Sequence, residues 1–313
     1  MKNLKFNLLL VLAAFIWGAA FVAQSAGMEY IGPFTFNGIR FIIGGITLLP
    51  VVLIRRKRSR TGTLGNIKAT DCDSGASESA GQVRTTIRSG IICGCVLAVA
   101  SSFQQVGIIY TSAGKAGFIT ALYVIMVPIF GLLLFKRRSG VQLWIGAALA
   151  VVGMYFLCLS GGMSVNKGDI LVFICAIFFT LHILTVDKLA PAVDGISLSC
   201  VQFFTAGILC SLVVPFTETV SLSSVIDAAV PLLYTGVLSC GVAYTLQVVG
   251  QKRTSPVLAS LLLSLESVFS VITAWIILGD AMSGREILGC LLVFAAIVLA
   301  QLPGRKGVPG DAA

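Results

Sequence analysis

The sequence predicts an all-α integral membrane protein with ten transmembrane helices, arranged as two inverted repeats of five helices each. Composition is the first reason. Of the 313 residues, 57% are hydrophobic and only 11% are charged, and the mean hydropathy is +0.98. A soluble domain carries about 25% charged residues. The second reason is that the apolar residues fall into runs long enough to cross a bilayer, and the third is an internal repeat.

The apolar runs are each about 20 residues long, the length that a helix rising 1.5 Å per residue needs to cross about 30 Å of hydrocarbon. The first run follows Lys2 and Lys5 and could pass for a signal peptide. Because it is long enough to span and nine more runs follow, we interpret it as a retained first helix. The ten predicted spans are 7–26, 33–54, 88–110, 115–135, 140–159, 168–186, 197–216, 231–250, 256–278 and 284–302.

The basic residues predict the topology, because positive residues near span ends stay on the cytoplasmic side. With the N-terminus inside, most of the 22 lysines and arginines fall on the cytoplasmic side. Only Lys115, Lys167 and Arg285 fall outside, and Arg40 lies within a span. Both termini are therefore expected in the cytoplasm, with a C-terminal tail at 303–313. The net charge of +9 is then a topology signal and does not indicate nucleic-acid binding.

One connection is much longer than the others. Residues 55–87 are rich in Ser, Gly and Thr and hold few apolar residues, a composition that buries too little surface to fold. We expect a flexible cytoplasmic linker whose basic beginning lies against anionic lipid headgroups. A regulatory or partner-binding role is the alternative.

The internal repeat appears when the chain is shifted by 143 positions, which places spans three to five on spans eight to ten without a gap. Gln104 then coincides with Gln247, and Tyr123 with Glu266. Other matches are Gly107 with Gly250, Thr111-Ser112 with Thr254-Ser255, Ala116 with Ala259, Leu122 with Leu265, Ile129 with Ile272 and Gly146 with Gly289. Each half, 1–160 and 168–302, holds an odd number of spans, so the copies must be inverted relative to each other.

Three short motifs carry a resemblance to a known family: Trp17-Gly18, the Asn-Gly-x-Arg motif at 37–40 and Leu-Gly-Asp at 278–280. Together they resemble EamA-type members of the drug/metabolite transporter superfamily over the whole chain except 55–87. The resemblance implies two inverted five-helix repeats and export of small metabolites or amino acids. The chain departs from the family at Glu266-Ser267, where the family often has Glu-Pro, and at Gly279-Asp280, where it has Gly-Glu.

Glu266 is the first candidate for the chemistry. A charge at mid-bilayer costs about 2.5–3.5 kcal/mol, so such a group usually faces a cavity and has a partner. Glu266 could take up a proton and couple transport to the proton gradient. The alternative is a static glutamate that is hydrogen-bonded to a neighbouring helix.

Two basic residues have alternatives of the same kind. Arg40 shares a helix face with Asn37 and could bind a substrate carboxylate bidentately, or it could clamp helix-end carbonyls or Glu266. Lys115 opens the fourth span. It could snorkel to the headgroups or line an outer mouth that attracts anions.

The remaining candidates are polar or aromatic residues on predicted helix faces. His182 could relay protons or simply pack, and interhelical hydrogen bonds explain many such groups without a substrate. The full set of candidates for substrate binding or coupling is Glu266, Arg40, Asn37, Trp17, Gln24, Tyr123, Lys115, His182, Tyr244 and Gln247.

These observations favour a secondary transporter that works by alternating access on a small solute, in a bacterial inner membrane or an equivalent plasma membrane. The chain has no GxxxxGK[ST] motif for an ATP motor. Eight of its nine cysteines lie in spans and it has one histidine, so no metal or other cofactor is expected. A membrane enzyme would need more acid, base or metal-ligating groups than one histidine and one membrane-embedded carboxylate. A non-transporting receptor or assembly subunit is the alternative.

Overall fold

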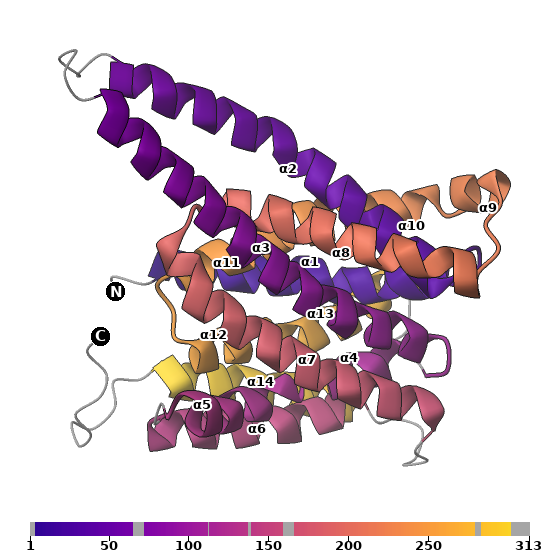
Figure 1. Cartoon of the computed structure of the whole chain (residues 1–313). Helices are drawn as coiled ribbons and strands as arrows, with labels where there is room; N and C mark the ends of the chain where they lie inside the picture. The colour runs from indigo at the N-terminus through magenta and orange to yellow at the C-terminus, as the bar shows by residue number, and fades with distance from the viewer. Residues whose placement is uncertain are drawn as a thin grey trace.

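The computed structural model describes residues 4–64, 72–111, 113–136, 139–158, 166–278 and 283–301, and it is helical throughout these ranges apart from short connections (Figure 1). The predicted tail at 303–313 and the motif residues Gly279-Asp280 lie outside them. The first half contains α1 (Leu4–Gly27), α2 (Pro33–Leu64), α3 (Cys72–Ile108), α4 (Ala113–Ala121), α5 (Tyr123–Phe135) and α6 (Val141–Cys158). The second contains α7 (Lys167–Leu189), η1 (Ala190–Ala192), α8 (Gly195–Thr217), α9 (Leu222–Asp227), α10 (Ala229–Leu233), the π-helical η2 (Tyr234–Tyr244), α11 (Thr245–Gln251), α12 (Pro256–Leu263), α13 (Leu265–Leu278) and α14 (Gly284–Gln301).

Each predicted span coincides with helical structure. Within the described residues, eight helical segments are long and apolar enough to cross a membrane, and Val141–Phe156 of α6 forms a shorter apolar helix. α6 packs along α14. The prediction of an all-helical membrane protein is confirmed, and the count of ten crossings stays a prediction.

The fourth and ninth predicted spans are each broken in the middle, at Leu122 between α4 and α5 and at Ser264 between α12 and α13. At the second break the Ser264 hydroxyl donates to the carbonyl oxygen of Leu261 at 2.7 Å. Such a bond competes with the regular helical hydrogen bonds and bends a helix. Both breaks lie within two residues of the positions that the repeat pairs at mid-span, Tyr123 and Glu266.

The structure differs from the predicted flexible linker at 55–87. Its described parts are helical, because α2 continues to Leu64 and α3 begins at Cys72, and Figure 1 shows the two helices projecting together beyond the bundle. Residues 65–71 lie outside the described part. Extending an existing helix adds one hydrogen bond for each residue whose conformation is fixed. Starting a new helix is less favourable, because several residues must be ordered for the first hydrogen bond. Long spans therefore readily continue past the bilayer.

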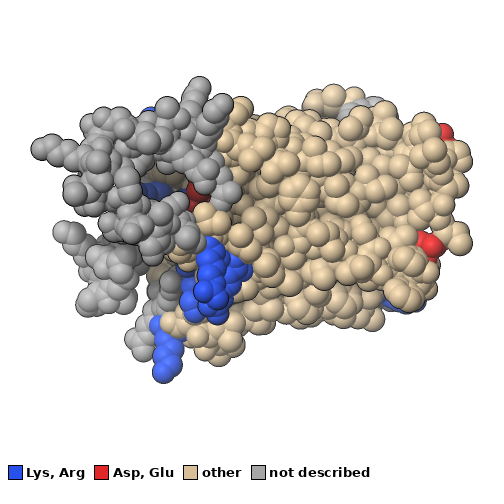
Figure 2. All heavy atoms as spheres, turned by 45° about the horizontal axis from the view of Figure 1, so that its top comes forward, with Lys and Arg blue, Asp and Glu red and all other residues tan. Residues whose placement is uncertain are grey.

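The surface between the two ends of the molecule is apolar. Phe216, Leu133 and Ile276 are 87%, 70% and 71% exposed, which a soluble protein would avoid and a lipid-facing one requires. Figure 2 shows a broad band without charged side chains between two charged ends, with the larger group of Lys and Arg at one end and Asp and Glu, together with further Lys or Arg, at the other. We call these the Arg55 end and the Lys115 end.

The two halves pack as antiparallel partners at α2 and α8. At the Lys115 end, the Glu218 carboxylate that follows α8 accepts hydrogen bonds from the backbone N–H groups of Phe34 and Thr35 at 2.7 and 2.9 Å. At the other end, Arg55 of α2 pairs with Asp194 at the start of α8, with 3.1 Å between Nη1 and Oδ1. The first turn of α2 therefore lies beside the last turn of α8.

Positions that the sequence repeat matches also make matching contacts. The Thr111 hydroxyl donates to Asp169 near the start of α7 at 2.8 Å, and the Thr254 hydroxyl donates to Asn7 near the start of α1 at 3.1 Å. Figure 1 places these two helix starts at opposite ends of the bundle. The helix pairs follow the same exchange of halves: α3 with α7 mirrors α11 with α1, and α1 with α13 mirrors α7 with α5.

A close crossing of two helices, α6 and α14, allows the packing of the fold to be tested. A Cβ atom on Gly153 of α6 would lie 2.8 Å from the carbonyl oxygen of Gly289 in α14 and 2.9 Å from the backbone nitrogen of Val293. Membrane helices approach this closely only through small residues. Gly153→Leu is expected to lower the free energy of unfolding by about 1–3 kcal/mol, measured by denaturant titration in mixed micelles.

Gly131 of α5 supplies the matched control, since a Cβ atom there meets nothing within 4 Å. Gly131→Ala is expected to leave stability unchanged or to raise it by up to about 1 kcal/mol, because alanine forms helix better than glycine. Equal effects of the two substitutions would contradict the packing of α6 on α14.

Candidate functional site

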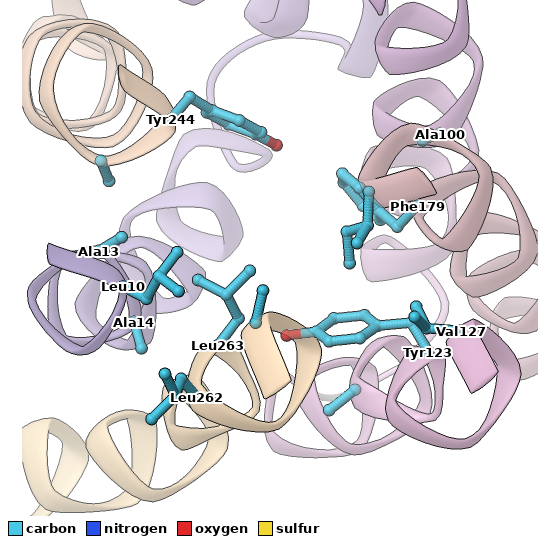
Figure 3. Close-up of a cluster of buried hydrophobic side chains, with 14 of the residues drawn as sticks. Leu10, Ala13, Ala14, Ala100, Tyr123, Val127, Phe179, Tyr244, Leu262 and Leu263 are labelled. Atoms are coloured by element: carbon cyan, nitrogen blue, oxygen red, sulfur yellow. The ribbon is translucent and has the colours of Figure 1, made fainter. Parts of the chain in front are cut away.

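A cavity lies between the two halves near the middle of the molecule. Figure 3 shows Tyr123, Phe179, Tyr244 and Leu263 around a central space, with the Tyr244 hydroxyl pointing into it. The volume open to the centres of water molecules is about 40 Å³, which is room for about three waters. The lining residues are Trp17, Phe21, Gln24, Arg40, Gln104, Thr120, Tyr123, Phe179, Ile183, Ser239, Tyr244, Gln247, Leu263 and Glu266.

The lining contains residues that the sequence repeat pairs with each other. Gln104 and Gln247 both line the cavity, as do Thr120 and Leu263, and Tyr123 and Glu266. The cavity is therefore built from corresponding positions of the two halves. It lies where the halves meet and not within either of them.

One of these pairs is in direct contact. The Tyr123 hydroxyl donates a hydrogen bond to Oε1 of Glu266 at 3.1 Å across 143 positions of sequence. Both side chains are buried, 4% exposed each. Tyr123 opens α5 directly after the break at Leu122, and Glu266 is the second residue of α13 after the break at Ser264. Discontinuous helices of this kind form the binding sites of many secondary transporters.

Arg40 reaches the cavity from α2. Its Nη1 donates to Oε1 of Gln24 at 2.8 Å, and its guanidinium carbon lies 4.9 Å from the ring centre of Phe41 and 5.7 Å from that of Phe36. The residue is only 2% exposed, and Nε has no hydrogen-bond partner. Arg40 forms no ion pair with any carboxylate of the described residues.

Trp17, Tyr244 and Gln247 complete the predicted residues that line the cavity. The Trp17 indole donates to the carbonyl oxygen of Ser239 in the π-helical η2 at 3.3 Å, and its ring lies edge-on to Tyr244 with 4.6 Å between ring centres. Stretches of π-helix often occur at functional sites. Oε1 of Gln247 is buried without a partner.

Three predicted candidates lie outside the lining. Asn37 donates to the carbonyl oxygen of Ser101 at 3.0 Å. His182 is fully buried, with Nε2 3.3 Å from Oε1 of Gln202 and its ring edge-on to Tyr244. Lys115 pairs with Asp169.

The Lys115 pair closes the end of the bundle beyond the cavity. Nζ of Lys115 lies 2.5 Å from Oδ2 of Asp169, and the two side chains are 17% and 6% exposed. Asp169 also accepts from the Thr111 hydroxyl and, as part of a capping box, from the backbone N–H of Asn166. An apolar cluster contains Ile108 of α3, Ala116 and Ile119 of α4, Val172 of α7 and Phe21 of α1.

Sequence reasoning missed half of the lining. Gln104 carried a usable signal, because the repeat places it opposite the candidate Gln247. Thr120 is equivalent to Leu263 in the repeat. Because Leu263 is apolar, the sequence did not indicate that either residue lines the cavity. Phe21, Phe179, Ile183 and Ser239 look like ordinary core positions in sequence. Among the described residues, no three His, Cys, Asp or Glu side chains are grouped so that they could hold a metal ion.

Comparison with known proteins relates this chain to a family of transporters. The EamA-like transporter family matches residues 4–159 and again 166–302. An uncharacterised transporter of Archaeoglobus fulgidus is 30% identical over 301 residues, covering 96% of this chain and 87% of that protein. The inner membrane transporter YedA of Escherichia coli, also uncharacterised, is 24% identical, covering 92% and 87%.

The fold is also found among solved structures. One crystal structure superposes with a TM-score of 0.74 at 18% identity, covering 95% of this chain and 96% of the other. With two family matches that together span nearly the whole chain, the chain belongs to the EamA-like transporter family of drug/metabolite transporters and is a multi-pass membrane transporter.

Proposed function

We propose that this protein is a secondary transporter that carries a small solute through the central cavity by alternating access of two inverted five-helix repeats. In this proposal ten spans cross the membrane, both termini are cytoplasmic and the Arg55 end faces the cytoplasm, as the concentration of basic residues there favours. The direction proposed is export of a metabolite or amino acid, which rests on the resemblance to the family's exporters.

The observation that carries the proposal is the hydrogen bond between Tyr123 and Glu266. Equivalent residues of two related copies can touch only near the axis that relates the copies. The lining of the cavity by three equivalent pairs supports the same location. Secondary transporters with inverted repeats bind their substrates at this interface.

The size of the cavity supports a moving mechanism. About 40 Å³ admits a few waters and no amino acid, so the halves must separate before a solute can enter. Contacts between the halves bridge both ends of the bundle: Arg55 with Asp194 at one, and Lys115 with Asp169 at the other. Alternating access then consists of releasing one of these ends at a time.

Glu266 is the proposed coupling site. Its carboxyl group is 4% exposed, has the Tyr123 hydroxyl as hydrogen-bond donor, and forms no ion pair with a basic residue of the described part of the chain. A bare charge in this position costs about 2.5–3.5 kcal/mol. The carboxyl group is therefore expected to exchange a proton when the cavity changes the side of the membrane to which it is open. The proton gradient would then drive the solute.

Flux in proteoliposomes tests this proposal, with a panel of labelled amino acids and metabolites and an imposed proton gradient. Wild type is expected to accumulate at least one solute. Glu266→Gln, which keeps the shape and a hydrogen-bond acceptor, is expected to abolish gradient-driven accumulation and to leave exchange across the membrane.

Glu29→Gln is the control, because Glu29 is exposed at the end of the bundle and lies outside the cavity. Unchanged accumulation in Glu266→Gln would assign Glu266 a structural role and move the coupling elsewhere. If wild type moves nothing across the panel, the non-transporting receptor or assembly subunit becomes the better function.

A further inference from the structure

The charge of the cavity points to a class of substrate. Arg40 is a permanent cation, because a guanidinium does not lose its proton in a protein. Burying it without an anion is costly. Of its five N–H donors one is bound to Gln24, and Nε is buried without a partner. The rings of Phe41 and Phe36 hold the guanidinium in place but supply no negative charge.

Glu266 does not compensate Arg40. Although both residues line the same cavity, they form no ion pair, and the bond to Glu266 comes from Tyr123. A carboxyl group can lose its charge by taking up a proton, whereas Arg40 cannot lose its own. The lining therefore carries a net charge of either zero or +1, never a negative one, so an anion is the occupant that balances it.

The rest of the lining fits an apolar body. Trp17, Phe21, Tyr123, Phe179 and Tyr244 place five aromatic rings around the space. Ligand sites typically combine such walls with a few polar groups that fix orientation. The amide groups of Gln24 and Gln247 are neutral hydrogen-bonding groups in the lining that suit this orienting role.

We propose that the cavity binds an organic anion with an aromatic or other apolar body, and that Arg40 holds its carboxylate or equivalent anionic group. This inference rests on the proposed function, since it names the substrate class of the same site. A planar guanidinium presents paired N–H donors that match the two oxygens of a carboxylate. A proton on Glu266 would accompany the anion, which makes the loaded cavity neutral.

The test uses four solutes that share one body: phenylpropanoate, phenylpropanol, phenylpropylamine and phenylalanine. Binding to the purified full-length chain in detergent is measured by titration calorimetry, and by tryptophan fluorescence because Trp17 lines the cavity. Phenylpropanoate is expected to bind about 10- to 100-fold more tightly than the alcohol, the usual value of a hydrogen-bonded charge. The amine is expected to bind no better than the alcohol.

Variants of Arg40 connect this preference to the residue. Arg40→Gln is expected to remove the difference between acid and alcohol, and Arg40→Lys to keep part of it, because lysine retains the charge without the paired donors. Arg55→Gln is the matched control at an exposed ion pair, and it should leave the preference intact. The comparison of solutes on wild type stands even if Arg40→Gln does not fold.

Three results would overturn the proposal: no saturable binding of the carboxylate, equal binding of acid and alcohol, or binding of phenylalanine at least about 10-fold tighter than phenylpropanoate, which would mean that an ammonium group is recognised. Flux separates these failures from failure of the transporter itself. If the amine or the alcohol moves across proteoliposomes while the acid does not, transport stands and the anion is wrong. If the acid binds and nothing moves, the binding site stands and transport is wrong.

Discussion

Asp169→Ala is expected to lower the free energy of unfolding by about 3–5 kcal/mol, the usual effect of removing one partner of a buried ion pair. The Asp169 side chain is 6% exposed and that of Lys115 is 17% exposed. The substitution takes the carboxylate away from the Lys115 ammonium, from the Thr111 hydroxyl and from the backbone N–H of Asn166. Denaturant titration in mixed micelles measures the change.

Arg55→Ala at the opposite end is the matched comparison. It also breaks an ion pair between the two halves, but here the side chains of Arg55 and Asp194 are 58% and 47% exposed. Water and salt weaken such pairs, so the expected cost is at most about 1 kcal/mol. Arg55→Ala is preferable to a change at Asp194, which also caps α8 through the backbone N–H of Ser197.

Similar losses of stability in Asp169→Ala and Arg55→Ala would contradict the expectation that the Lys115–Asp169 pair is the stronger of the two. If the costs differ as expected, the Arg55 end is the easier one to open from the conformation seen in the structure. The first movement of the transport cycle would then occur where the basic residues gather, and the Lys115 end would remain closed by its ion pair and the apolar cluster around Val172.

The sequence predicted the spans well because burial in lipid leaves a simple signal. Every backbone group must be satisfied within the segment, and every exposed side chain must be apolar, so composition alone locates helices such as α1 and α8. The repeat predicted which residues correspond, and the shared contacts of Thr111 and Thr254 agree with it. These features depend on local composition or on comparison of the chain with itself.

Long-range pairing was out of reach of the sequence. Asp169 looks like an ordinary acid in the first turn of a helix, and nothing near it indicates that Lys115, 54 positions earlier, is its partner. The repeat made Tyr123 and Glu266 equivalent but did not predict that they touch. Other equivalent positions, such as Lys115 and Leu258, lie at opposite ends of the bundle. Whether two equivalent residues touch depends on their distance from the axis that relates the two halves, and the sequence does not give the position of this axis.

Exchanging the two residues at the axis, Tyr123→Glu with Glu266→Tyr, is expected to recover most of the stability that each single change loses. Glu266→Tyr alone places two rings where one ring and a smaller carboxyl group fit, and overpacking costs about 1–3 kcal/mol. Tyr123→Glu alone leaves a gap and brings two carboxyl groups together, which cannot both be charged. The double variant restores one ring, one carboxyl group and the hydrogen bond.

Denaturant titration of the wild type, the two single variants and the double variant gives the coupling energy. We expect it to favour the double variant by about 1–3 kcal/mol, the range for residues in contact. The control is the exchange Lys115→Leu with Leu258→Lys, also an equivalent pair. Because Lys115 opens α4 at one end of the bundle and Leu258 lies near the start of α12 at the other (Figure 1), the effects of these two changes should add.

The transport activity of the double variant then shows whether the carboxyl group can be supplied by either half or must come from the second half. If the acid needs only to be at the axis, the double variant will keep proton-driven accumulation, since the carboxyl group remains in the same cavity with a tyrosine as its donor. If the acid must approach Arg40 and the bound anion from the second half, stability will return without accumulation. Additive losses with no recovery would contradict the placement of Tyr123 and Glu266 on a common axis, and with it the observation on which the proposed function rests.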